Sequence, residues 1–165
     1  MPESPSTSVR SSVVVEAPIE RAFAVFTDHI AGWWPPEHHL LEGELAGTVF
    51  EPRVGGNVYD LGVDGSECRW ARVLVYEPPD RVVISWDISP EWQLETDLTK
   101  ASEVEIRFVA ESPGQTRVEL EHRHIDRHGD GWEQMHRDVG SPEGWATMVG
   151  AFADHLALAP SRPPG

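Results

Sequence analysis

The sequence predicts an α+β domain in which one antiparallel sheet of about six to seven strands shares a core with a long helix. Three observations support this prediction. A strand at residues 9–16 and an amphipathic helix at 18–28 open the chain. From residue 43 onward apolar and polar side chains alternate with a period of two, the pattern of half-buried strands. A longer segment at 141–156 carries one apolar stripe and closes the chain.

The first elements follow from local preferences. β-Branched residues favour the strand at 9–16. Pro18 suits the first turn of the next helix, where its missing N–H would have no partner. That helix presents an apolar face made by Ala22, Phe23, Val25 and Phe26. A second short helix is expected at 30–34 and ends before the double proline that follows it.

The middle of the chain reads as strands separated by turn residues. A Gly55-Gly56 turn joins the first two, a proline-rich turn follows the third, and a Ser-Pro-Gly turn precedes the last. A short helix is expected near residues 132–139. The predicted strands span residues 48–52, 57–61, 67–76, 81–88, 102–110 and 115–124.

The closing helix has clear start signals. Ser141 is expected to be its N-cap, Pro142 fits the first helical position, and Glu143 complements the positive end of the helix dipole. Met148 borders the apolar stripe, which consists of Trp145, Val149, Phe152 and Leu156. A stripe of this kind packs on a sheet.

Length and composition favour one domain at residues 9–158, with disordered Pro/Ser-rich tails at 1–8 and 159–165. No apolar run approaches the ~20 residues that span a bilayer. The first residues have no apolar stretch of a secretory signal, and the single Cys68 has no cysteine to pair with. A cytoplasmic protein is therefore expected.

The charge balance excludes some classes of partner. Thirteen Lys and Arg residues stand against 28 Asp and Glu residues, giving a formal net charge of −15. Nucleic-acid binding depends on basic residues that neutralise phosphates, and an acidic membrane surface repels an acidic chain. We therefore expect neither a nucleic-acid nor a membrane partner.

Several short phrases of the sequence resemble a known family. They are Val14-Val15-Glu16-Ala17-Pro18-Ile19-Glu20-Arg21-Ala22-Phe23, Trp33-Trp34-Pro35, Gly55-Gly56, Tyr76-Glu77-Pro78-Pro79-Asp80-Arg81-Val82-Val83, Trp86 and Gly144-Trp145. With this order of elements, the chain resembles the START-like (SRPBCC) superfamily over about residues 9–158. It is most similar to the branch related to the C-terminal domain of the Hsp90 ATPase activator.

The resemblance implies a helix-grip fold, in which a curved antiparallel sheet wraps around the long C-terminal helix and leaves a cavity between them. It does not imply one activity, because members include ligand carriers, sensors, polyketide cyclases and co-chaperone fragments. The full Hsp90 activator also has a separate N-terminal domain. This chain has no room for one, so Hsp90 activation is not expected.

Large aromatic residues are the first candidates for the walls of such a cavity. Trp33 and Trp34 lie at the corner after the first helices, and Trp86 lies on a strand. Trp145, Met148 and Phe152 would form the wall on the last helix. Tryptophan suits both a filled core and a binding pocket, because it combines apolar area with an N–H that needs a partner. Both interpretations stay open here.

Two histidines are the sharpest polar signal. His122 and His124 share a face of the last strand with Val118 and Leu120, whereas the residues between them are charged. Both imidazoles are therefore expected to point inward. Histidines at i and i+2 can hold a metal, with a third ligand from His128, His38, His39 or a carboxylate. We predict no metal and no cofactor, and expect structural hydrogen bonds, ligand contacts or acid–base chemistry instead.

The preferred function is the binding of a small, largely apolar molecule between the sheet and the last helix. The alternative is a cyclase or dehydratase that uses His122 or His124 as a general base. A third hypothesis is an Hsp90-related interaction module, which would present an exposed apolar patch on the sheet. The charged outward strand residues disfavour that module, and a monomer or homodimer is expected.

Overall fold

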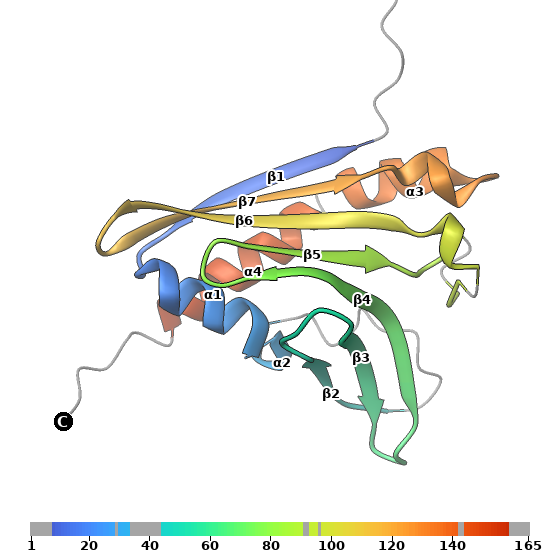
Figure 1. Cartoon of the computed structure of the whole chain (residues 1–165), viewed down its shortest axis with the longest axis horizontal. Coiled ribbons are helices and arrows are strands. Elements are labelled where there is room, and N and C mark those ends of the chain that lie inside the picture. Colours follow the sequence, from blue (N-terminus) through green and yellow to red (C-terminus); the bar gives the residue numbers. More distant parts are fainter. Residues whose placement is uncertain are drawn as a thin grey trace, which may run out of the picture.

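A computed structural model describes residues 8–28, 30–33, 44–90, 93–95, 97–141 and 144–158. Within these residues, seven antiparallel strands form a sheet in the order β1-β7-β6-β5-β4-β3-β2 (Figure 1). The strands are β1 (Val9–Val15), β2 (Leu45–Phe50), β3 (Asn57–Gly62), β4 (Glu67–Glu77), β5 (Arg81–Trp86), β6 (Ser102–Ser112) and β7 (Gln115–Arg123). The α-helices are α1 (Ile19–Asp28), α2 (Ile30–Trp33), α3 (Trp132–Gly140) and α4 (Trp145–Leu158), and the 3₁₀ helices are η1 (Leu98–Lys100) and η2 (Ile125–His128).

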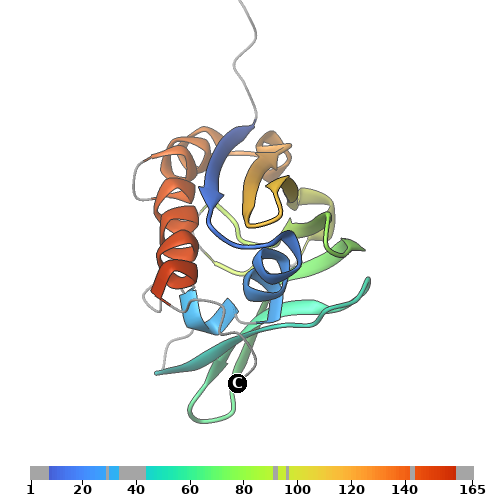
Figure 2. The ribbon, with the colours of Figure 1, turned by 90° about the vertical axis from the view of Figure 1, so that its left-hand side faces the viewer.

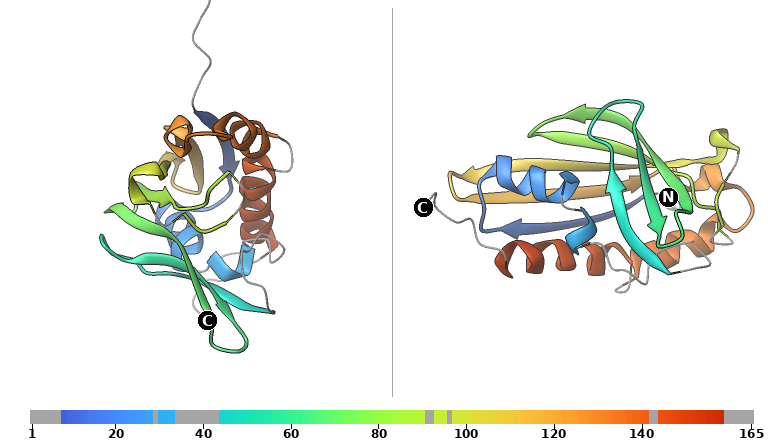
Figure 3. Two further views of the ribbon diagram at one scale, coloured as in Figure 1. Left: turned by 90° about the vertical axis from the view of Figure 1, so that its right-hand side faces the viewer. Right: turned by 90° about the horizontal axis from the view of Figure 1, so that it is seen from below.

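The arrangement confirms the predicted α+β helix-grip fold. The sheet is curved, and α4 lies along β1 at one edge of its concave face (Figures 2 and 3). This concave face is called the hollow face. Helices α1 and α2 lie at the same hollow face and contact α4. The described helices include none that is long and apolar enough to cross a membrane.

Alternation along the strands separates an inner from an outer face. On β7 every second side chain is buried, from Thr116 to His122, and the residues between them are more exposed. The register pairs Val104 of β6 with His122, and Ile106 with Leu120. The inward side chains of β6 and β7 are therefore mostly apolar, and polar residues such as His122 occupy single positions among them.

Register shifts bend the β2–β4 part of the sheet. They occur between Leu45 and Gly47, between Val58 and Tyr59, and between Val73 and Val75. Such irregularities increase local bending and twist. β4 accordingly curves strongly along its length and carries β3 and β2 around the hollow (Figure 1).

Several predicted boundaries need correction, among them the strand predicted at 48–52, which spans residues 45–50 as β2. Helix α4 begins at Trp145, and Ser141 instead ends α3, where its Oγ donates to the backbone oxygen of Asp138 at 2.7 Å. A serine suits either role, because its hydroxyl bonds to nearby backbone groups of both kinds. The strand predicted at 81–88 stops at Trp86, and Ile88 forms an isolated bridge. Pro142, Glu143, residues 1–7 of the tail predicted at 1–8, and the tail predicted at 159–165 lie outside the described residues.

Candidate functional site

A buried polar chain crosses the hollow face of the sheet. The Nε2 atom of His122 lies 2.6 Å from the Oγ of Ser102, and the same Oγ lies 2.7 Å from Nε2 of His128. On the other side of the His122 ring, Nδ1 accepts a hydrogen bond of 3.0 Å from Nε1 of Trp145. All four side chains are buried, although they come from β7, β6, η2 and α4.

Strand register and one backward turn bring these four residues together. Ser102 is the first inward-facing residue of β6. It lies two residues before Val104, which is the register partner of His122. After β7, η2 folds back and its last residue, His128, reaches Ser102. Trp145 is the first residue of α4 and lies over the same end of the sheet. The cluster thus connects Ser102, His122 and His128 of the sheet and η2 to Trp145 of α4.

Burial decides the charge of the two histidines. Loss of solvation lowers the pKa of His122 to about 3, and the neighbouring His128 and His136 act in the same direction. Burial also lowers the pKa of His128, although the charges of Glu95 and Asp87 oppose the effect. His122 is therefore neutral near pH 7. With Nδ1 already engaged by the indole, it is unsuited to be the general base that the sequence suggested.

Tryptophan rings form a wall beside the polar chain. The Trp86 ring lies 5.7 Å from Trp70, 5.2 Å from His122 and 5.4 Å from Trp145, measured between centroids. These tilted and edge-to-face contacts are favourable aromatic geometries. The buried Nε1 of Trp86 has no hydrogen-bond partner in the described part of the chain. The wall therefore combines three buried indole rings with one donor that has no partner among the described residues.

A second polar group lies at the other end of this wall. Asp60, on the inner face of β3, is 1% exposed and accepts from Thr48 Oγ1 at 2.9 Å and from Trp70 Nε1 at 3.3 Å. Its register partner, Cys68, is also buried. Burial raises the pKa of the Cys68 thiol, and the charge of Asp60 raises it further. This thiol stays protonated near neutral pH, which disfavours a nucleophilic role.

The predicted aromatic wall residues occupy the core. Trp33 packs on Phe26 at 4.8 Å and on Phe152 at 5.4 Å between ring centroids, and its Nε1 donates to the backbone oxygen of Val25 at 3.1 Å. Phe152 and Met148 are buried on α4. Their contact with a ligand remains a prediction. Trp34 lies outside the described residues.

One site prediction is wrong. His124 does not share the inward face of His122, because β7 ends at Arg123 and His124 is exposed. Its backbone adopts a left-handed conformation, with φ 60° and ψ 36°, which redirects the chain into η2. The alternation argument fails here because it holds only while the strand continues.

Sequence reasoning missed three residues of the site. The strands predicted at 102–110 and 57–61 include Ser102 and Asp60 but give neither a role in the site, and His128 is named only as a possible third metal ligand. The signal for Ser102 and Asp60 is a polar residue on an otherwise apolar alternating face, next to Val104 and Val58 respectively. His128 has no local signal, since its place depends on the turn after β7.

No group of three metal-binding side chains occurs among the residues that the structure describes. His38 and His39 lie outside those residues, so the absence of a metal remains a prediction.

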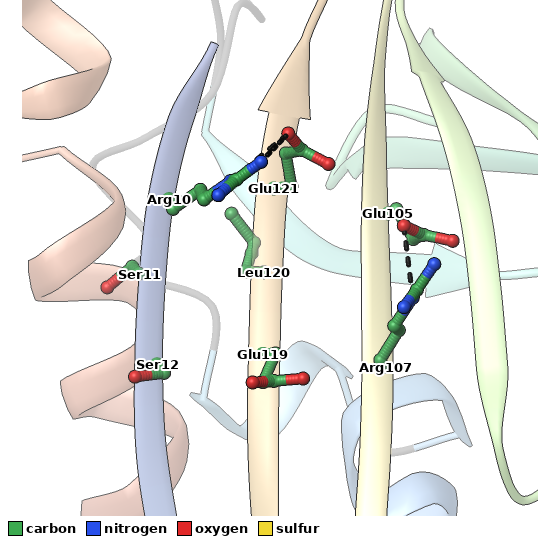
Figure 4. A pocket seen from close by; sticks show the side chains of 8 residues that line it. All are labelled: Arg10, Ser11, Ser12, Glu105, Arg107, Glu119, Leu120 and Glu121. Atoms are coloured by element: carbon green, nitrogen blue, oxygen red, sulfur yellow. Dashed lines mark hydrogen bonds and ion pairs between the residues drawn. The ribbon is translucent and has the colours of Figure 1, made fainter.

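The outer face of the sheet is charged. A depression of about 620 Å³ lies over β1, β7 and β6, with Arg10 paired to Glu121 and Arg107 to Glu105 (Figure 4). The Glu105 side chain is 5% exposed and also pairs with Arg81 and Arg123. The depression is lined by Arg10, Ser11, Ser12, Glu105, Arg107, Glu119, Leu120 and Glu121. Its lining is mostly charged or polar, so it does not suit an apolar molecule.

A smaller depression of about 420 Å³ lies by the start of α1. It is lined by Ile19, Glu77, Asp80, Arg81, Arg107, Phe108, Val109 and Ala110. It offers no ring wall comparable to that around Trp86.

Comparisons with known proteins identify relatives over nearly the whole chain. The model of the family described as Activator of Hsp90 ATPase homolog 1-like protein matches residues 16–157. An anthrahydroquino-γ-pyrone synthase, Txn09, is 44% identical, with a TM-score of 0.64 over 94% of this chain and 99% of that chain. No curated protein sequence matches.

Two further solved structures have the same fold. The self-sacrificing resistance protein CalC from Micromonospora echinospora is 28% identical, with a TM-score of 0.68 over 96% of this chain and 99% of that chain. A protein from Nitrosomonas europaea is 14% identical, with a TM-score of 0.67 over 97% and 100%. The latter supports the fold alone.

Proposed function

This chain belongs to the family of Activator of Hsp90 ATPase homolog 1-like proteins, and we propose that it binds a polycyclic aromatic polyketide between the sheet and α4 and closes an oxygen-containing ring on it. The observation that carries this proposal is the 44% identity, over 99% of its length, with a γ-pyrone synthase. The proposal joins the binding and cyclase hypotheses drawn from the sequence.

The aromatic wall supports the binding step. Trp70, Trp86 and Trp145 pack together as buried rings between the sheet and α4. Flat aromatic ligands gain apolar burial and ring–ring contacts on such surfaces. The unused Trp86 N–H offers a hydrogen bond to a ligand oxygen, which would fix the orientation of the rings.

Closure of a γ-pyrone requires an addition and a dehydration. In the addition, a phenolic oxygen bonds to a ketone carbon of a 1,3-diketone side chain, the phenol loses its proton, and the ketone oxygen gains one. The resulting hemiketal then loses its hydroxyl group together with a proton of the neighbouring CH2 carbon, so that one water leaves and the ring double bond forms. Such a site needs a proton acceptor and a hydrogen-bond donor for the ketone oxygen. Asp60 fits the acceptor as a buried carboxylate on the inner face.

Binding can be tested with a commercial ligand. We expect 1,8-dihydroxyanthraquinone to quench the tryptophan fluorescence of the chain and to add its mass in native mass spectrometry. Freshly purified protein should be measured first, because a resident ligand would appear as extra mass over the denatured chain. Saturable binding supports the proposal, and absence of both quenching and added mass counts against it.

Turnover can be tested with a hydroxyanthraquinone that carries a 1,3-diketone side chain next to the hydroxyl group. We expect the protein to accelerate the loss of one water from this compound. Mass spectrometry over time measures the rate of this loss. Asp60→Asn should lower the rate by about a hundredfold or more if the carboxylate takes the proton. Asp130→Asn is the matched control, since Asp130 is exposed.

The second candidate is binding without turnover. The likeness to CalC favours it. That protein is 28% identical over nearly the whole chain, and it is named a self-sacrificing resistance protein, whereas Txn09 is named a synthase. Under this alternative the anthraquinone binds, the diketone compound is not converted, and Asp60→Asn changes neither result.

A further inference from the structure

One arrangement of the hydrogen atoms gives an acceptor to every donor of the buried polar chain between Trp145 and His128. An indole N–H only donates, so Nδ1 of His122 must accept from Trp145 and carry no proton. A neutral imidazole has one N–H, which therefore lies on Nε2 of His122 and donates to Ser102. The Ser102 hydroxyl then donates to Nε2 of His128, and the proton of His128 lies on Nδ1.

This last N–H has nothing to donate to. Nδ1 of His128 is buried and has no partner among the described residues, as is also true of Nε1 of Trp86. His128 is 3% exposed, and Trp86 5%. Buried donors are nearly always bonded to protein or to ordered water. Two donors of one polar cluster are therefore available to acceptor oxygens of water or of a bound ligand.

We propose that Nδ1–H of His128 donates to a carbonyl oxygen of the bound ligand, and that Trp145 is the positioning residue that keeps the proton there, through His122 and Ser102. The identity of the ligand rests on the proposed function, whereas the proton arrangement does not. In ring closure the same donor would polarise the ketone that the phenolic oxygen attacks.

Trp145 sets the direction of the chain because reversal would place two donors face to face. If the proton of His128 moved to Nε2, the Ser102 hydroxyl would keep its own hydrogen bonded only by donating to Nε2 of His122. The proton of His122 would then lie on Nδ1, against the indole N–H of Trp145. If Ser102 instead accepted from both imidazoles, its own hydrogen would be buried without an acceptor. The reversed arrangement thus loses a hydrogen bond that the observed one makes.

The arrangement can be read in the free protein by ¹⁵N NMR of the histidine side chains. We expect the Nδ1–H tautomer at His128 and the Nε2–H tautomer at His122. Trp145→Phe should release His122 into a mixture of both tautomers, while the control Trp33→Phe, which removes another buried indole N–H, should not. An Nε2–H tautomer at His128 in the unmodified chain would overturn the inference.

A second variant keeps the test independent of the folding of Trp145→Phe. Ser102→Ala cuts the chain between the two imidazoles. It should leave His122 as the Nε2–H tautomer and let His128 populate both forms. Unchanged tautomers at His128 would show that Ser102 does not transmit the arrangement.

The donor role is tested with 1,8-dihydroxyanthraquinone. Binding should shift the Nδ1–H signal of His128, and His128→Gln should weaken binding by about tenfold. The exposed His124→Gln is the matched control. Equal affinity in both variants overturns the donor role. If the anthraquinone does not bind, the proposed function fails instead, and the tautomers of His128 and His122 in the free protein still support or overturn the proton arrangement.

Discussion

Acidification should destabilise the protein through His122. In the folded chain burial lowers the pKa of His122 to about 3 from its ordinary value of 6.5. Between these pH values His122 is protonated in the unfolded chain and neutral in the folded chain. The stabilisation is therefore complete above pH 6.5 and is lost progressively as the pH falls toward 3.

The magnitude follows from the width of this interval. Each pH unit below 6.5 costs about 1.4 kcal/mol. At about pH 4.5 the loss from this histidine alone is about 3 kcal/mol, a large part of the ~5–15 kcal/mol that holds a typical domain folded. Burial of His128 acts in the same direction, since its pKa is also lowered.

The assay is urea unfolding followed by tryptophan fluorescence, at about pH 7.5 and about pH 4.5. His122→Gln removes the titrating group and should be less stable than the unmodified chain at the higher pH, because it disturbs buried hydrogen bonds. Between the two pH values it should lose about 3 kcal/mol less. His124→Gln, at an exposed position, should follow the unmodified chain.

Parallel pH dependences for the unmodified chain and His122→Gln would refute this reasoning. They would mean that the folded protein accommodates a charged imidazole at position 122, through water or rearrangement of the indole. The neutral hydrogen-bond chain would then not describe the protein at low pH.

Three substitutions on α4 and its approach test the packing. Gly144→Ala should cost about 1–3 kcal/mol or more, because a Cβ there would press on the backbone carbonyl of Val139. Gly150→Ala has open space around its Cβ and should instead stabilise the helix by about 0.5–1 kcal/mol. Phe152→Ala should cost about 3–5 kcal/mol, because the ring is fully buried between two aromatic side chains. Urea midpoints with unchanged slopes measure all three, and a neutral Gly144→Ala or Phe152→Ala would contradict the packing described.

Much of the fold could be predicted because its signals are local. The two-residue alternation of β6 and β7 and the stripe on α4 reflect how each side chain partitions between water and core. Predictions that depended on where an element ends were weaker. His124 was assigned to the wrong face because a left-handed residue ends β7, and Ser141 was assigned to the wrong helix because both ends accept its hydroxyl.

The sequence by itself determined that His122 faces inward and that Trp86 and Trp145 lie near the hollow, because strand and helix periodicity place these side chains. Only the tertiary structure decided that His122 meets Ser102 and Trp145, and that His128 returns to the same serine. These partners are 20 or more residues apart in the chain. Their meeting depends on strand register, on the turn into η2 and on the position of α4, and none of these is encoded in the pattern of any one segment.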